Sequence, residues 1–162
     1  MRQITFDFEN MGGVSHLYAI PPSSYAGIRM DYLNKQKKLD LTRPEDIIEI
    51  PVYADGTFSF NEVHSLSDAG DSYAIEISAV VPKNQVNNAA LIEELERGEW
   101  FLLCSDMNGT IRLSGDQNVQ LKCTTQKSTG MAVADRNQIA LTFACTQENP
   151  AVFVSVPGIT VI

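Results

Sequence analysis

Cysteine is scarce in this sequence, with only three residues among 162. An odd number of this size does not build the paired framework of a disulfide-stapled protein. Each cysteine falls within a strand-like stretch and in phase with its apolar neighbours. We therefore interpret Cys104, Cys123 and Cys145 as small buried side chains in a reducing environment.

Long apolar runs are also missing. No stretch approaches the ~20 apolar residues that a membrane-spanning helix needs. The first residues, Met1–Glu9, alternate apolar and polar side chains and contain two acids, so they lack the apolar core of a signal peptide. We expect no membrane association and cytoplasmic synthesis, which is compatible with later incorporation into a particle.

Positive charge is in deficit, because 12 Lys and Arg stand against 20 Asp and Glu, giving a net charge of −8. Tight nucleic-acid binding needs clustered excess cations, so we expect none. Four of the cations nevertheless lie within nine positions, namely Lys35, Lys37, Lys38 and Arg43. This cluster has two interpretations: a solvated loop, or a positive patch that docks onto the acidic face of a neighbouring subunit.

The motifs of common enzymes and cofactor sites are absent from the sequence. It has no Gly-x-Ser-x-Gly, no Gly-x-x-x-x-Gly-Lys and no Gly-x-Gly-x-x-Gly, and its two histidines, His16 and His64, lack metal-ligand spacing. We predict no catalytic, cofactor-binding or metal-binding residues, and no cofactor. Carboxylate pairs at glycosidase separation are conceivable for Asp7/Glu9 and Glu76/Glu99, although acids on the polar faces of strands are more simply solvent contacts.

The stretch from Glu99 to Gly115 organises the fold. An apolar run, Trp100–Cys104, is followed by a turn at Asp106–Gly109 and then by alternating residues. Asn-Gly between two such runs predicts a β-hairpin with a primed turn, in which both turn residues have positive φ. The same turn and Asp55-Gly56 resemble parts of calcium-binding loops, but neither has the ligand spacing such a loop requires.

Period-two alternation predicts strands over most of the remaining chain. The predicted strands are Ile4–Phe8, Val14–Ile20, Ile47–Tyr53, Thr57–Val63, Tyr73–Val81, Val119–Thr125, Ile139–Cys145 and Val152–Val156. Ile77 and Phe143 fall on the apolar faces of two of them. A short helix at Pro44–Ile48, suggested by a capping-box pattern, is the alternative at the third strand.

One helix is predicted over Ala89–Arg97, because Asn87 or Asn88 can cap it, apolar residues form a stripe and Gly98 stops it. The segment from Pro21 to Asp46 has no clear period and is expected to be an irregular arm or loop. The fold class is therefore mainly β. We expect a single domain over residues 1–162, an antiparallel sandwich or partly closed barrel of about ten strands with one flanking helix.

Turn and strand signatures across most of the chain form a recognisable succession. They are Gly12–Pro21, Gly70–Tyr73, Val80–Lys83, Trp100–Asp106, Asn108-Gly109, Leu113–Gly115, Thr129-Gly130, Asp135–Asn137, Ile139–Phe143 and Asn149–Phe153. This succession resembles a family of short all-β proteins from phage and prophage-like gene clusters. Pro21–Asp46 is the part that matches least.

The resemblance implies a tail-tube-like fold and a non-enzymatic virion structural subunit, tail-associated and of the tube or completion type. It would act by self-assembly or docking, with copies of itself or other virion tail proteins as partners, and would be a homo-oligomer in the assembled state. The alternative is a carbohydrate- or ligand-binding β-module. Its candidate contact residues are Trp100, Tyr18, Tyr25, Tyr32 and Tyr53. An enzyme with a carboxylate pair is a third reading.

Overall fold

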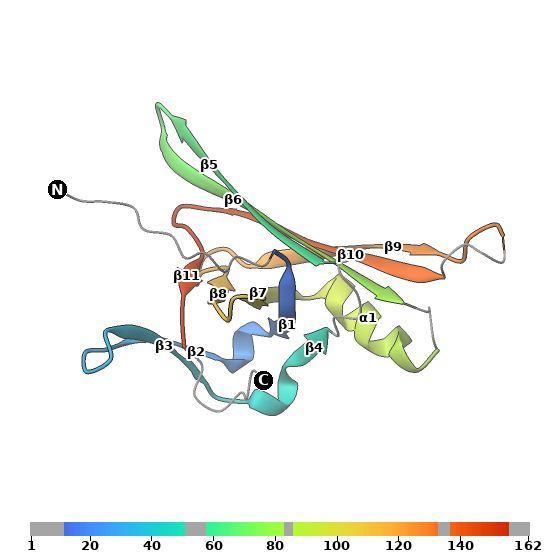
Figure 1. Ribbon diagram of the computed structural model, residues 1–162, viewed down its shortest axis with the longest axis horizontal. Helices are drawn as coiled ribbons and strands as arrows, with labels where there is room; N and C mark the ends of the chain where they lie inside the picture. The colour runs from blue at the N-terminus through green and yellow to red at the C-terminus, as the bar shows by residue number, and fades with distance from the viewer. Residues whose placement is uncertain (1–11, 51–57, 83–85, 133–136, 156–162) are drawn as a thin grey trace.

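The computed structural model describes residues 12–50, 58–82, 86–132 and 137–155 (Figure 1). The strands are β1 (Val14–Ile20), β2 (Tyr25–Asp31), β3 (Gln36–Leu41), β4 (Ile48–Ile50), β5 (Phe58–Ser67), β6 (Gly70–Pro82), β7 (Glu99–Asp106), β8 (Ile111–Ser114), β9 (Leu121–Ser128), β10 (Gln138–Gln147) and β11 (Val152–Phe153). The helix α1 spans Ala89–Arg97, and short 3₁₀ helices span Pro22–Ser24, Pro44–Asp46 and Val86–Asn88. The predicted strand Ile4–Phe8 and the predicted turn Asp55-Gly56 lie outside the described residues.

Nine strands form one antiparallel sheet in the order β11-β8-β7-β9-β10-β6-β5, with β1 and β4 attached through β7. The order ends at β11 and β5, so the sheet is not closed into a barrel. Strand β7 is shared, and the sheet bends there into two layers (Figure 1). The predicted fold class, mainly β and antiparallel with one flanking helix, is confirmed.

Both faces of β7 are buried, which explains its continuous apolar sequence. Trp100, Leu102 and Cys104 point into the main core between the two layers. Phe101 and Leu103 point the opposite way, into a second, smaller core. Burial raises the pKa of the Cys104 thiol to about 12, so this cysteine is an uncharged core side chain at neutral pH.

The main core is built on the neighbouring strands β6 and β10. Ile75, Ile77 and Ala79 of β6 are buried and alternate with more exposed residues, and Leu141 and Phe143 do the same on β10. Phe143 lies directly opposite Ile77 in the ladder. The inward faces predicted for these two strands are therefore confirmed.

Helix α1 has the predicted bounds and covers one end of the core. Its buried residues are Ile92 and Leu95. The indole Nε1 of Trp100 donates a hydrogen bond of 3.1 Å to the backbone oxygen of Leu95, which ties the helix to β7. No helix within the described residues is long and apolar enough to cross a bilayer.

The segment Pro21–Asp46 is not irregular, and this expectation is wrong. It contains an antiparallel hairpin, β2–β3, whose inner residue Leu39 is buried and whose Tyr25 ring stacks on Phe101 at 4.2 Å. The alternation is hidden in the sequence because a β-bulge between Tyr25 and Gly27 shifts the register of β2. The hairpin covers the second core and forms a third layer below β7 and β1 (Figure 1).

For the segment around Ile47, the predicted strand and the alternative, a short helix, are each partly correct. Pro44–Asp46 forms a single 3₁₀ turn, and β4 follows it and pairs with β1. Strand β4 has this one partner in the sheet and so lies at an edge, as the nearby proline predicts. The rest of the predicted strand, Pro51–Tyr53, lies outside the described residues.

The β7–β8 hairpin is confirmed, but its turn is not of the primed type. Gly109 alone has positive φ in this turn, at +79°, and its N–H bonds the backbone oxygen of Asp106 at 3.0 Å. Asp106 sets this geometry, because its Oδ1 accepts the N–H groups of Asn108 at 3.0 Å and Thr110 at 2.9 Å. A side chain that bonds its own turn in this way outweighs the preference of Asn-Gly.

Replacing Gly109 with valine is expected to destabilise the protein by about 1–3 kcal/mol, because a β-branched residue is strained at positive φ. Space is not the cause, since a Cβ at this position meets no atom within 4 Å. Urea denaturation of Gly109→Val measures the loss. Gly109→Asn is the matched control, because asparagine tolerates this conformation and should lose clearly less. Equal losses in both variants would contradict the backbone explanation.

Candidate functional site

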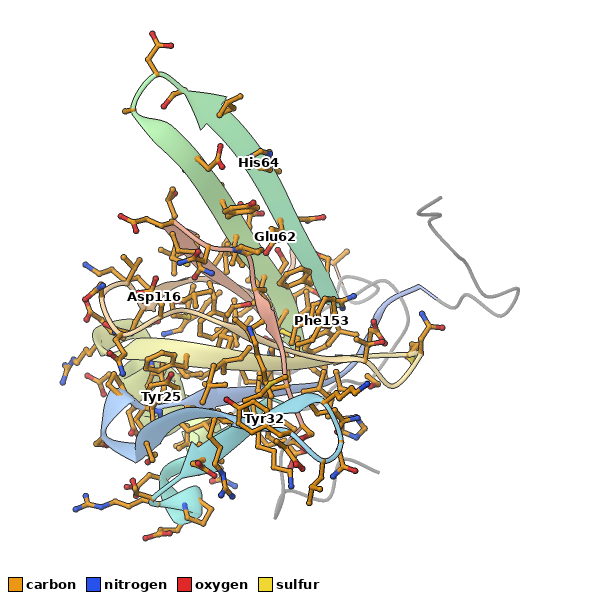
Figure 2. The ribbon with its side chains drawn as sticks, turned by 90° about the vertical axis from the view of Figure 1, so that its left-hand side faces the viewer. Tyr25, Tyr32, Glu62, His64, Asp116 and Phe153 are labelled. Carbon is orange, nitrogen blue, oxygen red and sulfur yellow. The ribbon has the colours of Figure 1, made fainter. Side chains whose placement is uncertain are left out.

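Two hairpins extend from the same end of the body (Figures 1 and 2). A groove lies between them. The upper one is β5–β6; we call its outer part, residues 61–74, the arm, and all residues from 61 to 71 are exposed. The lower one is β2–β3, called the basic hairpin. The groove has a volume of about 1150 Å³.

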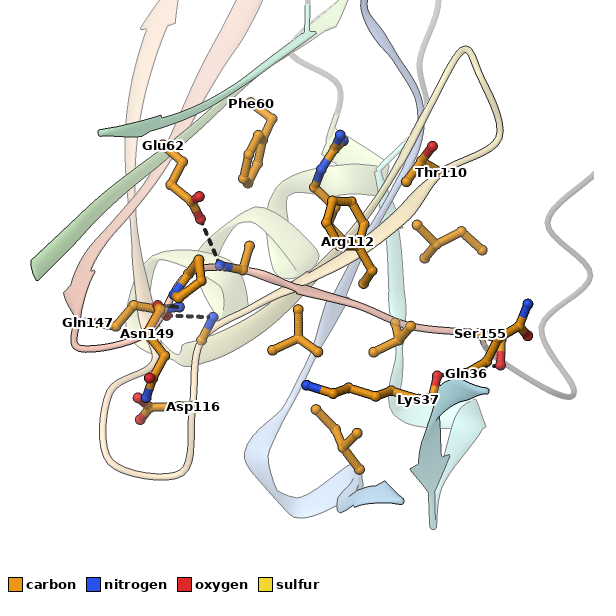
Figure 3. Close-up of a pocket in the computed structure, with 18 of the residues that line it drawn as sticks. Gln36, Lys37, Phe60, Glu62, Thr110, Arg112, Asp116, Gln147, Asn149 and Ser155 are labelled. Atoms are coloured by element: carbon orange, nitrogen blue, oxygen red, sulfur yellow. Dashed lines mark hydrogen bonds between the residues drawn. The ribbon is translucent and has the colours of Figure 1, made fainter. Parts of the chain in front are cut away.

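The groove takes its walls from segments far apart in the sequence (Figure 3). Its floor is formed by β8 and β11, including Val152 and Phe153. The base of the arm supplies Phe60 and Glu62 on one side, and the basic hairpin supplies residues such as Met30 on the other. Most of this lining is apolar, and charged side chains such as Glu62 and Arg112 lie among the apolar ones.

The base of the arm is fixed over the groove by two contacts. The carboxylate of Glu62 accepts the N–H of Ala151 at 2.7 Å, which ties β5 to the segment leading into β11 (Figure 3). The guanidinium of Arg112 lies over the rings of Phe60 and Phe153, at 5.5 and 5.1 Å from their centres. Its charge is also balanced by Asp106 at 3.0 Å. These contacts hold the groove open in a defined shape.

One end of the groove is closed by Gln147, a polar residue that is almost fully buried. Its Oε1 accepts the N–H of Gly115 at 3.1 Å, and its Nε2 donates to the backbone oxygen of Asn149 at 2.6 Å. Asp116 nearby accepts the N–H groups of Asn118 and Val119 at 2.7 and 2.8 Å. Both side chains are therefore used in shaping the loop between β8 and β9.

The basic hairpin is joined to the groove floor by the backbone. The N–H of Ser155 bonds the oxygen of Lys37 at 2.8 Å, and the oxygen of Ser155 accepts the N–H of Leu39 at 3.0 Å. The turn of the hairpin is held by Asp31. The Lys38 ammonium, 2.7 Å away, and hydrogen bonds from Asn34 hold the pKa of Asp31 well below its ordinary value, so this carboxylate stays ionised in mildly acidic solution.

At its base, one face of the β5–β6 hairpin packs on the main core. The same face continues along the arm, where the core has ended. Phe60 and Glu62 of β5 line the groove, and His64 follows Glu62 along the strand (Figure 2). Because side chains alternate along a strand, His64 and Leu66 lie on the same face as Glu62. His64 lies opposite Tyr73, with their rings stacked at 4.9 Å, and its Nε2 is 3.3 Å from an oxygen of Asp71. The side chain of Leu66 is 78% exposed. We call this side the inner face of the arm; within one copy, none of the described segments forms a layer over it.

The aromatic residues expected to contact a ligand are not gathered together. Trp100 is 2% exposed and Tyr18 is also buried, so neither can stack on a sugar, and this part of the prediction is wrong. Tyr25 lines the groove, whereas Tyr32 stands at the tip of the basic hairpin (Figure 2). Tyr53 lies outside the described residues.

The carboxylate pair Glu76/Glu99, considered conceivable from the sequence, does not form. The strands β6, β10, β9 and β7 lie side by side, and the two residues occupy one row across them, with Ala144 and Lys122 between. Three strand spacings separate their backbones by about 14 Å, beyond glycosidase geometry. Glu99 is instead 3.5 Å from Lys122. The other pair, Asp7/Glu9, lies outside the described residues.

In the part of the chain that the structure describes, neither histidine belongs to a group of three or more His, Cys, Asp or Glu side chains that could hold a metal ion. His16 lies beside Ser15, with Nδ1 at 3.1 Å from its Oγ, and His64 lies on the arm. The cation cluster is divided by the fold. Lys35, Lys37 and Lys38 belong to the basic hairpin, whereas Arg43 follows it.

Sequence reasoning did not find the groove, because its walls come from four separate segments and carry no motif. The one available signal was on β5, where Phe58 and Phe60 are followed in phase by Leu66 beyond the predicted strand end at Val63. Comparison of the chain with protein-family models, with curated proteins and with solved structures found no match.

Proposed function

We propose that this protein is a non-enzymatic structural subunit of a phage or prophage particle, tail-associated, which acts by self-assembly or by docking to other tail proteins. The particle assignment follows from the family that the sequence resembles. The observation that carries the assembly role is the arm, an exposed hairpin. Among the described residues, no segment covers its inner face and no strand pairs with the outer edge of β5.

A two-stranded hairpin standing alone is at best marginally stable in water, because it buries little apolar surface. The arm is such a hairpin, and it exposes Val63 and Leu66 on opposite faces. Strand β5 also presents an open edge of ten residues, which is a template for pairing with another chain. In an assembly, a partner would cover the exposed arm and could pair with the open edge of β5.

The charge of the chain supports the same role. A net charge of −8 repels phosphate groups, so a surface of this kind would not retain nucleic acid passing along it. The polar groups at the groove ends are used in structural hydrogen bonds, which is consistent with a surface for contact rather than for chemistry. The partners we propose are copies of this chain or other tail proteins.

The test is a variant that lacks the arm. Val63 and Ala74 are directly paired, so residues His64–Tyr73 can be replaced by Asn-Gly, a two-residue turn that joins paired strands. Negative-stain images of concentrated wild-type protein are expected to show oligomers, and the variant is expected to be monomeric with an unchanged near-ultraviolet dichroism spectrum. Oligomers of the variant equal to those of the wild type would contradict the role of the arm.

A second candidate function, a ligand-binding module, is favoured by one observation, the groove itself. It has the volume of a small-molecule site and exposes Phe153 beside Tyr25 and Phe60. A glycan array with Phe153→Ala as the control would show binding that this change removes. A Trp100 variant is unsuitable for that purpose, because this residue belongs to the core.

A further inference from the structure

Resting on the assembly role proposed above, we infer that the tip of the basic hairpin of one copy docks against the inner face of the arm of a second copy. The two hairpins extend from the same end of one molecule (Figures 1 and 2). They line opposite sides of the groove. Within one copy the groove keeps them apart, so each is left available to a neighbour.

The two hairpins carry opposite charge. Strands β5 and β6 and their turn, residues 58–82, contain four carboxylates and no Lys or Arg. The basic hairpin, residues 25–41, contains four cations and two carboxylates. Opposite potentials of this kind steer encounter and suppress pairing in the wrong orientation.

The ion pairs within the basic hairpin leave two cations for a partner. Arg29 forms an ion pair with Asp40 at 3.1 Å, and Lys38 forms one with Asp31 at 2.7 Å. No carboxylate among the described residues lies within 4.0 Å of the ammonium of Lys35 or Lys37. Both lysines are exposed, and both line the groove edge nearest the hairpin tip.

Apolar side chains accompany the charges on both surfaces. The hairpin tip presents Tyr32 at 84% and Leu33 at 95% exposure, next to a half-exposed Met30. The arm presents Leu66 and the partly exposed ring of Tyr73 on its inner face. A contact that buries these groups together removes apolar area from water on both sides, while the charges at the margin fix its orientation.

The occupant that fits this description is a second copy of the chain. Each molecule carries both complementary surfaces, so copies of the chain can cover every such surface without a second kind of protein. Because both hairpins extend from the same end, two copies related by a two-fold axis make the contact twice, each arm facing the hairpin of the other. An unrelated cationic protein would satisfy the arm but leave Tyr32 and Leu33 exposed.

The test reverses the charge of each surface separately. The first variant is Lys35→Glu with Lys37→Glu, and the second is Asp68→Lys with Asp71→Lys on the exposed tip of the arm. Like charges then face each other in either variant, and self-association measured by sedimentation velocity is expected to weaken at least about tenfold. Equal amounts of the two variants, mixed, are expected to associate again, because the reversed arm of one now faces the reversed hairpin of the other.

A matched control makes the same change of charge elsewhere. Glu45→Lys with Asp46→Lys lies on the 3₁₀ turn before β4, where both carboxylates are exposed. This variant should associate like the wild type. A rise in salt from about 50 to 500 mM should weaken association of the wild type, since exposed charges are screened over a few ångströms at the higher concentration.

The outcomes separate the two proposals. Wild-type association that neither reversal weakens, or a mixture that does not associate again, would overturn this contact and leave the assembly role standing on other surfaces. A wild-type protein that stays monomeric would overturn both this contact and self-assembly, and would leave only docking to other tail proteins. Loss of self-association in each variant, with recovery of association in the mixture, would establish the contact. Misfolding of either variant could not be repaired by mixing.

Discussion

Replacing Phe143 with alanine is expected to lower the free energy of unfolding by about 3–5 kcal/mol. Phe143 is fully buried in the main core and lies between Ile77 of β6 and Cys123 of β9 in the ladder. The loss combines the burial of the removed ring with the cavity that remains, since strands on both sides hold the backbone in place. Urea denaturation followed by tryptophan fluorescence measures it.

Thr146→Ala is the matched control for Phe143→Ala. Thr146 lies on the same strand, and its side chain is exposed on the opposite face. A change there is expected to stay within about 0.5 kcal/mol of the wild type. If Phe143→Ala were as stable as this control, the side of β10 that we place against the main core would be wrong.

Trp100→Ala is expected to cost about 3–5 kcal/mol as well, but for a different reason. Trp100 joins two elements, because its ring lies in the main core and its Nε1 bonds the backbone oxygen of Leu95. The ring also packs against Gly98, where a Cβ would meet the indole at 2.8 Å. Removing it therefore loosens the end of α1 in addition to opening a cavity.

Trp100→Phe separates the two parts of this effect. It keeps an aromatic ring in the core but leaves the oxygen of Leu95 without its donor, so an intermediate loss is expected. Chemical denaturation gives both values, and hydrogen exchange of the last turn of α1 shows whether the helix is released. Full stability of Trp100→Ala, with loss of binding to a sugar, would instead support a surface role for this residue and contradict its burial.

Elements whose buried residues follow the regular period of a strand or a helix could be predicted from the sequence. Strands β6 and β10 have one buried and one more exposed face, so their alternation is visible, and Ile77 and Phe143 fall where expected. Helix α1 combined an apolar stripe with a glycine stop and was predicted with its observed bounds. In each case local pattern and tertiary burial agree.

Prediction failed where a local feature interrupts the pattern. The bulge at Gly27 shifts the register of β2, and the outer face of β3 is polar, so the basic hairpin looked irregular. The side chain of Asp106 selected the turn at Asn108-Gly109, against the preference of that dipeptide. Both failures come from single residues whose effect depends on backbone geometry.

The candidate site was less predictable than the fold, because it depends on how distant segments come together. Phe60, Arg112 and Phe153 meet at the groove only after β5, β8 and β11 have folded. The cation cluster at Lys35–Lys38 was visible in the sequence, and its docking interpretation stays a prediction. The arm was hidden because the alternation of β5 becomes polar beyond Phe60.

Sedimentation velocity of the wild-type protein over a hundredfold range of concentration tests the assembly role most directly. We predict a sedimentation coefficient that rises with concentration, and falls back to the monomer value at every concentration when His64–Tyr73 is replaced by Asn-Gly. A wild-type protein that sediments as a monomer of 17.9 kDa throughout this range would contradict the account.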